Sequence, residues 1–243
     1  MPLALVDVET YAFREASANT FEAELGQDYW TYLVDYNRAK EGITRVLEEY
    51  QNMLPDHHQV LCFGSRNNFR YTIYDQYKSN RNKQRRPAGL KDFYEWIKEN
   101  WAYQEHEGIE GDDVVGINAD PEHGDVIISL DKDLKTLPGL HAQGQGVIDI
   151  SSLEADHAFY MQVLTGDTAD GYPGCPGIGK VKAAGLLEKC KTSQEMWEKV
   201  LGAFEKAHLS REYALKMARC ARILRPGEYD MENQRVSLWM PPE

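Results

Sequence analysis

The sequence lacks the residue patterns that mark secreted, membrane and zinc-binding proteins. Only four cysteines occur in 243 residues and no two form a Cys-x-x-Cys pair, which argues against a disulfide scaffold or a zinc ribbon and suits a reducing cytoplasm. The seven histidines form no His-Glu-x-x-His pattern. No apolar run approaches the roughly 18 residues of a membrane span, and the first residues lack the features of a signal peptide. We therefore expect a cytoplasmic protein with no membrane partner.

An excess of positive charge is also missing. The chain has 39 acidic against 27 basic residues, for a net charge of −12, and such a balance ordinarily argues against a nucleic-acid partner. The length allows one large domain or two small ones with a substantial core. Whether a nucleic-acid partner is excluded therefore depends on where the charges lie along the chain.

The apolar pattern predicts an α/β fold. Four short apolar runs indicate strands: LALVDV at the start, HQVLCF at 58–63, DVIISL at 125–130 and VIDI at 147–150. From about Trp30 to Tyr50, apolar residues recur at helical spacing and predict a helix. Strands that alternate with helices favour a mainly parallel central sheet flanked by helices. Ligands of such sheets gather at the carboxyl ends of the strands.

The pattern becomes helical after residue 150. Helical spacing covers 151–164, 180–189, 193–207 and 210–223, with a Gly/Pro-rich turn at 171–179. The next expected strand is VSLWM, at 236–240. We therefore predict an α/β domain over 1–150 and a helical module over 151–243.

Eight acids stand out because they lie at predicted strand ends or beside glycines. Like charges held close together raise one another's pKa unless a cation compensates them. A site with oxygen ligands alone suits Mg²⁺ or Mn²⁺, and two such ions about 4 Å apart can hydrolyse a phosphodiester. A single Asp is more often a surface acid or a helix cap, so the inference rests on the whole set: Asp7, Glu110, Asp112, Asp113, Asp131, Asp133, Asp167 and Asp170.

A basic arm and a glycine-rich turn supply the positive charge. Residues 66–91 hold eight basic side chains against one acid, with Phe and Tyr interleaved, so that cations could neutralise phosphates while bases stack on the rings. A solvated basic loop is the commoner fate of such a run. In PGCPGIGK, at 173–180, the glycines and the following helix could bring N–H groups to a phosphate, although a plain turn between helices is the alternative.

These segments carry a resemblance to a known family. GIEGDDVVG (108–116) is similar to the G-x-E-A/G-D-D motif of the 5′-nuclease or flap-endonuclease superfamily, and ISLDKDLKTL (128–137) resembles its S-x-D-K-D-x-x-x-L motif. LTGDTADGYPGCPGIGK (164–180) resembles its G-D-x-x-D-x-x-x-G-x-x-G-I-G-K segment. The ending MARCARILRPGEYD (217–230) most resembles the 5′→3′ exonucleases of short-tailed bacteriophages.

The resemblance implies a PIN-like nuclease that cuts 5′ ends and branch points of DNA with two Mg²⁺ ions, which Mn²⁺ can replace, and leaves 5′-phosphates. It also implies RNase H activity on RNA:DNA hybrids, and a role in primer removal, recombination or host-DNA breakdown. The first ion would be held by Asp7, Glu110 and Asp112, with Asp113 at or between the two sites. The second would be held by Asp131, Asp133, Asp167 and Asp170.

The resemblance further implies how DNA is held. The segment at about 66–100 would be the family's arch or clamp, in which Lys78 and Arg81 approach the scissile phosphate and Tyr77 stacks. Branched, nicked or 5′-ended duplex is the expected partner, together with a replicative polymerase, and the chain is expected to act as a monomer in the bacterial host cytoplasm. A helix-hairpin-helix would grip the duplex and bind K⁺. Its residues and the further arm contacts would be Arg70, Lys83, Arg85, Arg86, Gly177, Gly179, Lys180 and Lys182.

One position departs from the family pattern. Where the family places a further metal-directed Asp after the second strand, this chain has Ser65, a neutral and weaker ligand. We therefore expect activity with a raised Mg²⁺ requirement. Two alternatives stay open: a non-catalytic DNA-binding protein with a degenerate metal site, and a PIN-type ribonuclease.

Overall fold

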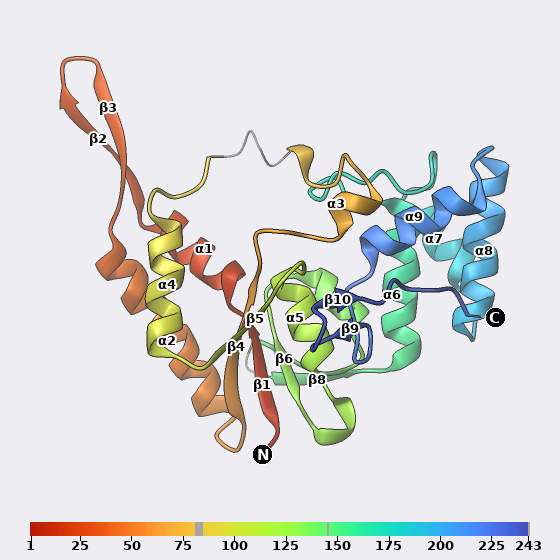
Figure 1. The fold of residues 1–243 in the computed structure, drawn as a ribbon, viewed down its shortest axis with the longest axis horizontal. Helices are drawn as coiled ribbons and strands as arrows, with labels where there is room; N and C mark the ends of the chain where they lie inside the picture. The colour runs from red at the N-terminus through yellow and green to blue at the C-terminus, as the bar shows by residue number, and fades with distance from the viewer. Residues whose placement is uncertain (81–84, 145, 243) are drawn as a thin grey trace.

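The computed structural model describes residues 1–80, 85–144 and 146–242, built around a six-stranded sheet (Figure 1). The strand order is β5-β4-β1-β6-β7-β8. All neighbouring pairs are parallel except β7 and β8, which are antiparallel. The mainly parallel α/β fold is therefore confirmed. The strands are β1 (Leu3–Asp7), β4 (His58–Gly64), β5 (Tyr103–His106), β6 (Val126–Ile128), β7 (Gly139–Gln143) and β8 (Gly146–Ile150).

Helices cover both faces of this sheet. On one face, helices α1 (Val8–Ala18), α2 (Tyr36–Met53) and α4 (Leu90–Asn100) pack on Ala4 and Val6 of the central strand. On the other face, α5 (Gly111–Asn118) packs on Leu5. Successive side chains of a strand point to opposite faces, so the apolar run of β1 serves both cores. Its last residue, Asp7, emerges at the edge where the strand ends.

The residues after β8 form a second helical core. Its helices are α6 (Ser152–Thr165), α7 (Lys180–Leu187), α8 (Ser193–Lys206) and α9 (Arg211–Ala221), each within a few residues of the predicted helical stretches. The expected strand over 236–240 is wrong beyond its first residue, since only the short pair β9 (Tyr229–Asp230) and β10 (Arg235–Val236) forms. Short helices also occur, among them α3 (Arg70–Ile73) and the 3-10 turns η2 (Pro121–His123) and η3 (Lys132–Thr136). No helix in the described ranges is long and apolar enough to cross a membrane.

A projecting hairpin corrects the prediction of a helix from Trp30. Strands β2 (Thr20–Gly26) and β3 (Tyr29–Val34) pair antiparallel, and α2 begins only after Asp35, whose side chain caps it. The run YWTYLV is rich in aromatic and β-branched residues, which favour strands. The hairpin extends away from the sheet (Figure 1) and leaves Trp30 61% exposed, although tryptophan side chains are on average highly buried.

A pair of tryptophan substitutions tests this difference in packing. Trp197 of α8 is 3% exposed within the helical core, so Trp197→Ala should lower the free energy of unfolding by about 3 to 5 kcal/mol. Trp30→Ala removes a largely exposed ring and should change it by less than about 0.5 kcal/mol. Urea denaturation measures both. A large loss from Trp30→Ala would show that the hairpin is packed against the protein.

Candidate active site

The carboxylate cluster begins at the carboxyl end of β1. Asp7 is 2% exposed, and its Oδ2 accepts hydrogen bonds from the hydroxyls of Thr10 and Ser129, each at 2.7 Å. Ser129 directly follows β6, and its Oγ also accepts the N–H of Asp131 at 2.8 Å. The adjacent parallel strands β1 and β6 thus bring Asp7 and Asp131 to one edge of the sheet.

Four carboxylates influence one another at this edge. Burial raises the pKa of Asp112 well above its usual value, and the charges of Asp7, Asp131 and Glu110 raise it further. Burial also raises the pKa of Asp7, where the Thr10 and Ser129 hydroxyls counteract it and Asp131 adds repulsion. Glu110 is the N-cap residue of α5, and Asp112 lies in the first turn of this helix. These residues therefore form a cluster that a cation would stabilise.

A second group of acids adjoins the first. Burial raises the pKa of Asp133, and Asp131 and Asp167 raise it further. The Lys132 ammonium lies 3.0 Å from Asp133 and 4.0 Å from Asp167. Asp167 accepts the N–H groups of residues 169 and 170, which shapes the turn that presents Asp170. Sequence reasoning assigned Asp131, Asp133 and Asp167 to one group, and the structure brings them together.

Glu110 is the exception among these acids because it already has cationic partners. Burial opposes its ionisation, but the charges of Lys78 and Arg70 lower the pKa of Glu110 to about 2. Lys78 pairs with Glu110 and lies 3.6 Å from Asp170. The Tyr77 hydroxyl lies 2.9 Å from both of these carboxylates. The arm therefore enters the site through Tyr77 and Lys78.

The prediction that Tyr77 stacks on DNA is wrong in this structure. Its side chain is 3% exposed, and its ring lies nearly parallel to that of Tyr172, with 6.3 Å between the centroids. A ring enclosed in this way offers no free face to a base. Tyr77 instead connects the arm to the helical core and to two of the site carboxylates.

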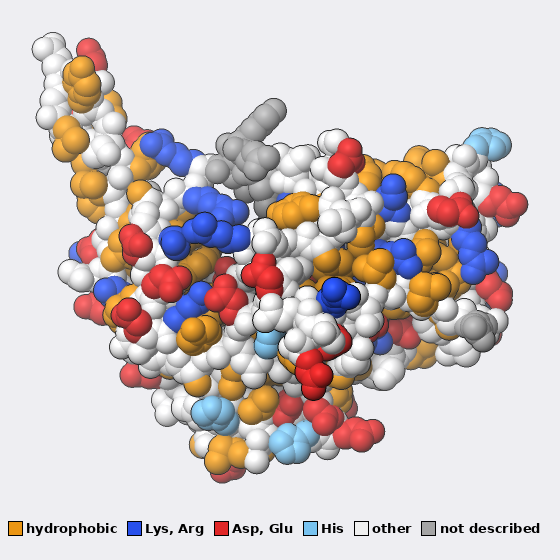
Figure 2. Space-filling model, in the orientation of Figure 1, with side chains coloured by type: hydrophobic (Ala, Val, Ile, Leu, Met, Phe, Trp, Pro, Cys, Tyr) orange, Lys and Arg blue, Asp and Glu red, His pale blue; other side chains and the backbone are white. Residues whose placement is uncertain are grey.

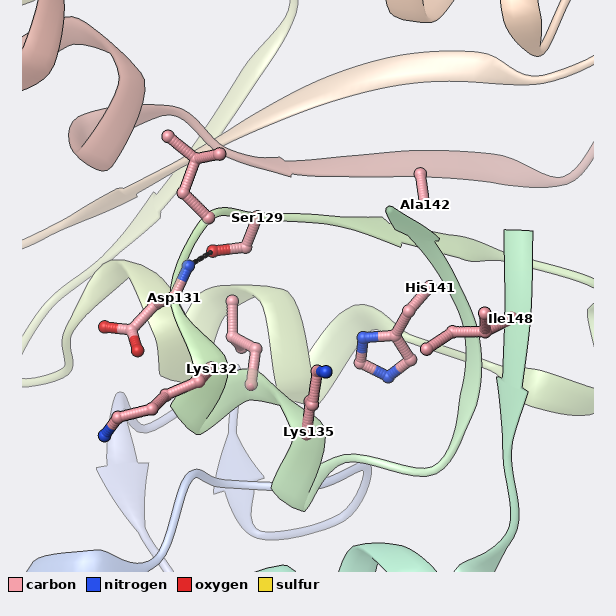
Figure 3. Close-up of a pocket in the computed structure, with 9 residues that line it drawn as sticks. Ser129, Asp131, Lys132, Lys135, His141, Ala142 and Ile148 are labelled. Atoms are coloured by element: carbon pink, nitrogen blue, oxygen red, sulfur yellow. Dashed lines mark hydrogen bonds between the residues drawn. The ribbon is translucent and has the colours of Figure 1, made fainter. Parts of the chain in front are cut away.

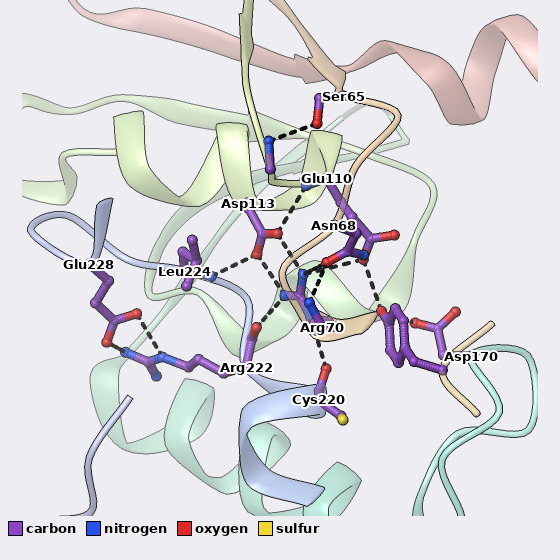
Figure 4. A network of polar contacts seen from close by, with 12 residues as sticks. Ser65, Asn68, Arg70, Glu110, Asp113, Asp170, Cys220, Arg222, Leu224 and Glu228 are labelled. Atoms are coloured by element: carbon purple, nitrogen blue, oxygen red, sulfur yellow. Dashed lines mark hydrogen bonds and ion pairs between the residues drawn. The ribbon is translucent and has the colours of Figure 1, made fainter. Parts of the chain in front are cut away.

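Arg70 and Asp113 form a buried ion pair, which corrects two predicted roles (Figure 4). The Arg70 guanidinium donates to both Asp113 oxygens at 2.6 and 2.7 Å, and also to the Cys220 and Arg222 carbonyls. Asp113 further accepts the N–H groups of Glu110 and Leu224. Asp113 is fully buried and Arg70 is 2% exposed, so the former does not face the metal site and the latter does not face DNA.

The structure describes some of the remaining basic residues of the arm and leaves others undescribed. Arg81 and Lys83 lie outside the described residues. Arg85 and Arg86 are exposed, and the Arg85 guanidinium lies 3.6 Å above the Tyr32 ring of the hairpin. Figure 2 shows Lys and Arg side chains gathered beside the base of this hairpin. A basic surface therefore lies beside the base of the hairpin.

The glycine-rich turn is tight at one point and open at another. Gly166 and Gly174 have positive φ. A Cβ on Gly166 would lie 2.3 Å from the backbone of Pro173, and a Cβ on Gly174 would lie 2.3 Å from the backbone of Gly166, so only glycine fits at either position. Gly177, also with positive φ, and Gly179 have open space around them. Lys180 and Lys182 are exposed, and the Lys182 ammonium donates to the Gly177 carbonyl at 2.9 Å.

The donor set fits a hard divalent cation. Every acid of the two groups offers oxygen, and Mg²⁺ is usually held by one or two carboxylates while it keeps several waters. Within the described ranges, no three Asp, Glu, His or Cys side chains enclose a single point as a metal cage. The ammonium groups of Lys78 and Lys132 lie among the carboxylates instead. Beside them is a pocket to which Ser129, Asp131, Lys132, Lys135 and His141 contribute (Figure 3).

Several residues of the site escaped the sequence reasoning. Thr10 and Ser129 orient Asp7 through their hydroxyls, and Lys132 lies between Asp133 and Asp167. Glu9 lies against Gly64 at the end of β4. The sequence feature that could have indicated Glu9 as a site residue is its position, two residues after Asp7 and at the start of a helix.

Breaking the Arg70–Asp113 pair tests its structural role. Arg70→Met leaves a buried carboxylate without its counter-charge and should lower the free energy of unfolding by about 3 to 5 kcal/mol. The double variant Arg70→Met/Asp113→Leu should recover part of this loss because it leaves neither charge unpaired. Chemical denaturation of the two single variants and the double variant measures the coupling. Strictly additive losses would contradict the direct interaction.

Comparison with known proteins agrees with this architecture. The family described as 5′-3′ exonuclease, N-terminal resolvase-like domain matches residues 2–159. The exodeoxyribonuclease of Enterobacteria phage T3 and the exonuclease of Escherichia phage T7 are each 26% identical, over 98% of this chain and 93% of theirs.

A solved structure shares the fold. It is the bacteriophage T5 flap endonuclease in a pseudo-enzyme-product complex with DNA and metal ions, with a TM-score of 0.57 and 15% identity over 91% of this chain and 93% of that one. Because the family match covers well over half of the residues, the chain belongs to the 5′-3′ exonuclease family.

Proposed function

We propose that this nuclease is a metal-dependent 5′→3′ exonuclease and flap endonuclease that hydrolyses DNA and leaves 5′-phosphates. The observation that carries the proposal is the cluster of Asp7, Asp112 and Asp131 beside a basic arm. Burial and the charges of neighbouring carboxylates, Asp131 among them, raise the pKa of Asp7 and of Asp112. A site of this charge needs divalent cations, and the neighbouring basic surface suits phosphates.

Two Mg²⁺ ions, replaceable by Mn²⁺, are the proposed cofactors. Asp7, Glu110 and Asp112 would hold one, and Asp131, Asp133, Asp167 and Asp170 the other. When bound, the ions would lower the pKa of water and stabilise charge on the phosphodiester oxygens. Thr10 and Ser129 would keep Asp7 oriented by the hydrogen bonds that they already donate.

Lys78 is the proposed electrophilic residue of the arm. Its ammonium lies within the cluster, between Glu110 and Asp170, so it could contact a phosphate at the same edge and stabilise the charge that develops there. Arg81 is proposed to act beside it, and Lys83, Arg85 and Arg86 to contact the DNA backbone.

The helical module is proposed to hold the duplex. Gly177, Gly179 and Lys180 are exposed around the start of α7, where backbone N–H groups favour a phosphate without reading sequence. Residues 151–243 would thus act as a helix-hairpin-helix module with a K⁺ ion at its carbonyls. The proposed substrates are branched, nicked and 5′-ended duplexes and RNA:DNA hybrids in a bacterial cytoplasm, and a replicative polymerase is the proposed protein partner.

A labelled 5′-flap duplex tests the reaction. Cleavage should require Mg²⁺ or Mn²⁺, stop with EDTA and yield a 5′-phosphate, and Asp112→Asn should lower the single-turnover rate by at least about 100-fold because it removes a site carboxylate. Asp92→Asn, on the exposed start of α4, is the matched control. Binding without product at any concentration of either metal would favour the non-catalytic alternative, and a preference for single-stranded RNA would favour the PIN-type ribonuclease.

Substitution of Lys78 separates chemistry from binding. Lys78→Ala should lower the single-turnover rate on flap DNA by about 100-fold, while the dissociation constant for the duplex changes by less than about 3-fold. Arg45→Ala, on the exposed face of α2 and outside the arm, is the control and should alter neither quantity strongly. An unchanged rate in Lys78→Ala would remove the residue from the catalytic machinery.

The raised carboxyl pKa values predict how pH affects the metal-free protein. Between the ordinary pKa of about 4.5 and the raised value of about 7 for Glu9, the folded state binds more protons than the unfolded state. The free energy of unfolding therefore falls as pH rises through this window. The melting temperature in EDTA should be lower at pH 8 than at pH 5.5, and Mg²⁺ should raise it more at pH 8. Equal melting at both pH values would contradict the clustering of ionised acids.

A further inference from the structure

Glu9 is a carboxylate of the candidate active site that lies outside the eight predicted acids. It is the second residue of α1, and its Oε2 accepts the N–H of Gly64, at the end of β4, at 3.1 Å. The same oxygen lies 3.2 Å from where a Cβ on Gly111 would stand. Glu9 therefore lies between the end of β4 and the turn of α5 that carries Glu110 and Asp112.

The charge of Glu9 lacks a close counter-charge. Burial is the main effect that opposes ionisation of Glu9, and the negative charges of its neighbours Asp7 and Glu110 oppose it further. Lys98 acts on it through space only, since its ammonium pairs with Glu105 at 2.7 Å and Glu95 at 3.6 Å. None of the ion pairs among the described residues includes Glu9. The side chain is half-buried, so part of it remains open to an ion.

The hydroxyl of Ser65 is turned away from this edge. Its Oγ donates to the Asn67 carbonyl at 2.7 Å and accepts the N–H of Gly108 at 2.9 Å. Both contacts hold the loop that follows β4, and neither involves an acid of the cluster. The carboxylate found at the end of β4 is therefore contributed by the start of α1 and not by position 65.

We propose that Glu9 is a ligand of the metal ion assigned to Asp7, Glu110 and Asp112, and that it supplies at the end of β4 the carboxylate that position 65 lacks. The inference rests on the proposed function, because it takes this cluster to hold a divalent cation. Glu9 thereby compensates for Ser65, and the raised Mg²⁺ requirement expected from Ser65 alone should be small.

Metal binding without DNA tests this role. Glu9→Gln keeps an oxygen that can accept the Gly64 N–H and removes only the charge. Electron paramagnetic resonance of free Mn²⁺ should show that the substitution raises the dissociation constant of one Mn²⁺ ion by at least about 10-fold, since even residues that only support metal ligands commonly have effects of this size. Glu15→Gln on the same helix is the control; Glu15 pairs with Arg14 at 3.0 Å and should bind Mn²⁺ as the unmodified protein does.

The melting temperature gives a second readout that does not depend on turnover. In EDTA at pH 8, Glu9→Gln should melt at a higher temperature than the unmodified protein because repulsion is removed, and it should gain less from added Mn²⁺. Unchanged Mn²⁺ affinity in Glu9→Gln would overturn the proposal and leave Glu9 as a partner of Gly64 only. Absence of Mn²⁺ binding by the unmodified protein would also overturn it.

The two proposals can fail separately. If the unmodified protein binds Mn²⁺, Glu9→Gln weakens that binding and flap DNA stays intact, then Glu9 is supported as a ligand while the nuclease activity is rejected. If flap DNA is cut and Glu9→Gln binds Mn²⁺ normally, then the Glu9 assignment alone is rejected.

Discussion

The buried ion pair of Arg70 and Asp113 is the interaction on which the rest of the site depends. Arg70 begins α3 in the arm, and Asp113 lies in α5. Arg70 also donates to the carbonyls of Cys220, in the last turn of α9, and of Arg222, directly after it. Three parts of the chain far apart in sequence therefore meet at one guanidinium. Because removal of one partner leaves a charge buried without compensation, the arm, the sheet and the helical core must assemble together.

Much of the fold could be predicted from the sequence because its signals are local. The buried strands β1, β4 and β6 are continuous apolar runs, and the C-terminal helices follow the spacing of their apolar residues. The hairpin was missed because YWTYLV satisfies helical spacing as well as it satisfies a strand, and only pairing with Thr20–Gly26 decides between them. β5 and β7 were missed because their sequences, YQEH and GLHAQ, contain no continuous apolar run, and pairing with the neighbouring strands holds them in place.

The site shows the same division between local and distant information. The positions of Asp7, Asp112 and Asp131 follow from strand ends and a helix start, which a motif records. The roles of Arg70, Tyr77 and Asp113 depend on burial by residues more than 30 positions away, so no local pattern distinguishes a ligand from an internal partner. Glu9 illustrates the converse case, in which a residue without a motif reaches the site across two elements.

The place of Tyr77 has a consequence for how the arm and the metal site communicate. Its hydroxyl lies between Glu110 and Asp170, while its ring is part of the helical core. A cation that draws these carboxylates toward itself must compete with Tyr77 and Lys78 for the same oxygens. Binding of a metal ion and the position of the arm are thus thermodynamically linked, and such linkage is reciprocal. DNA that moves Tyr77 or Lys78 would change metal affinity by the same factor by which metal changes DNA affinity.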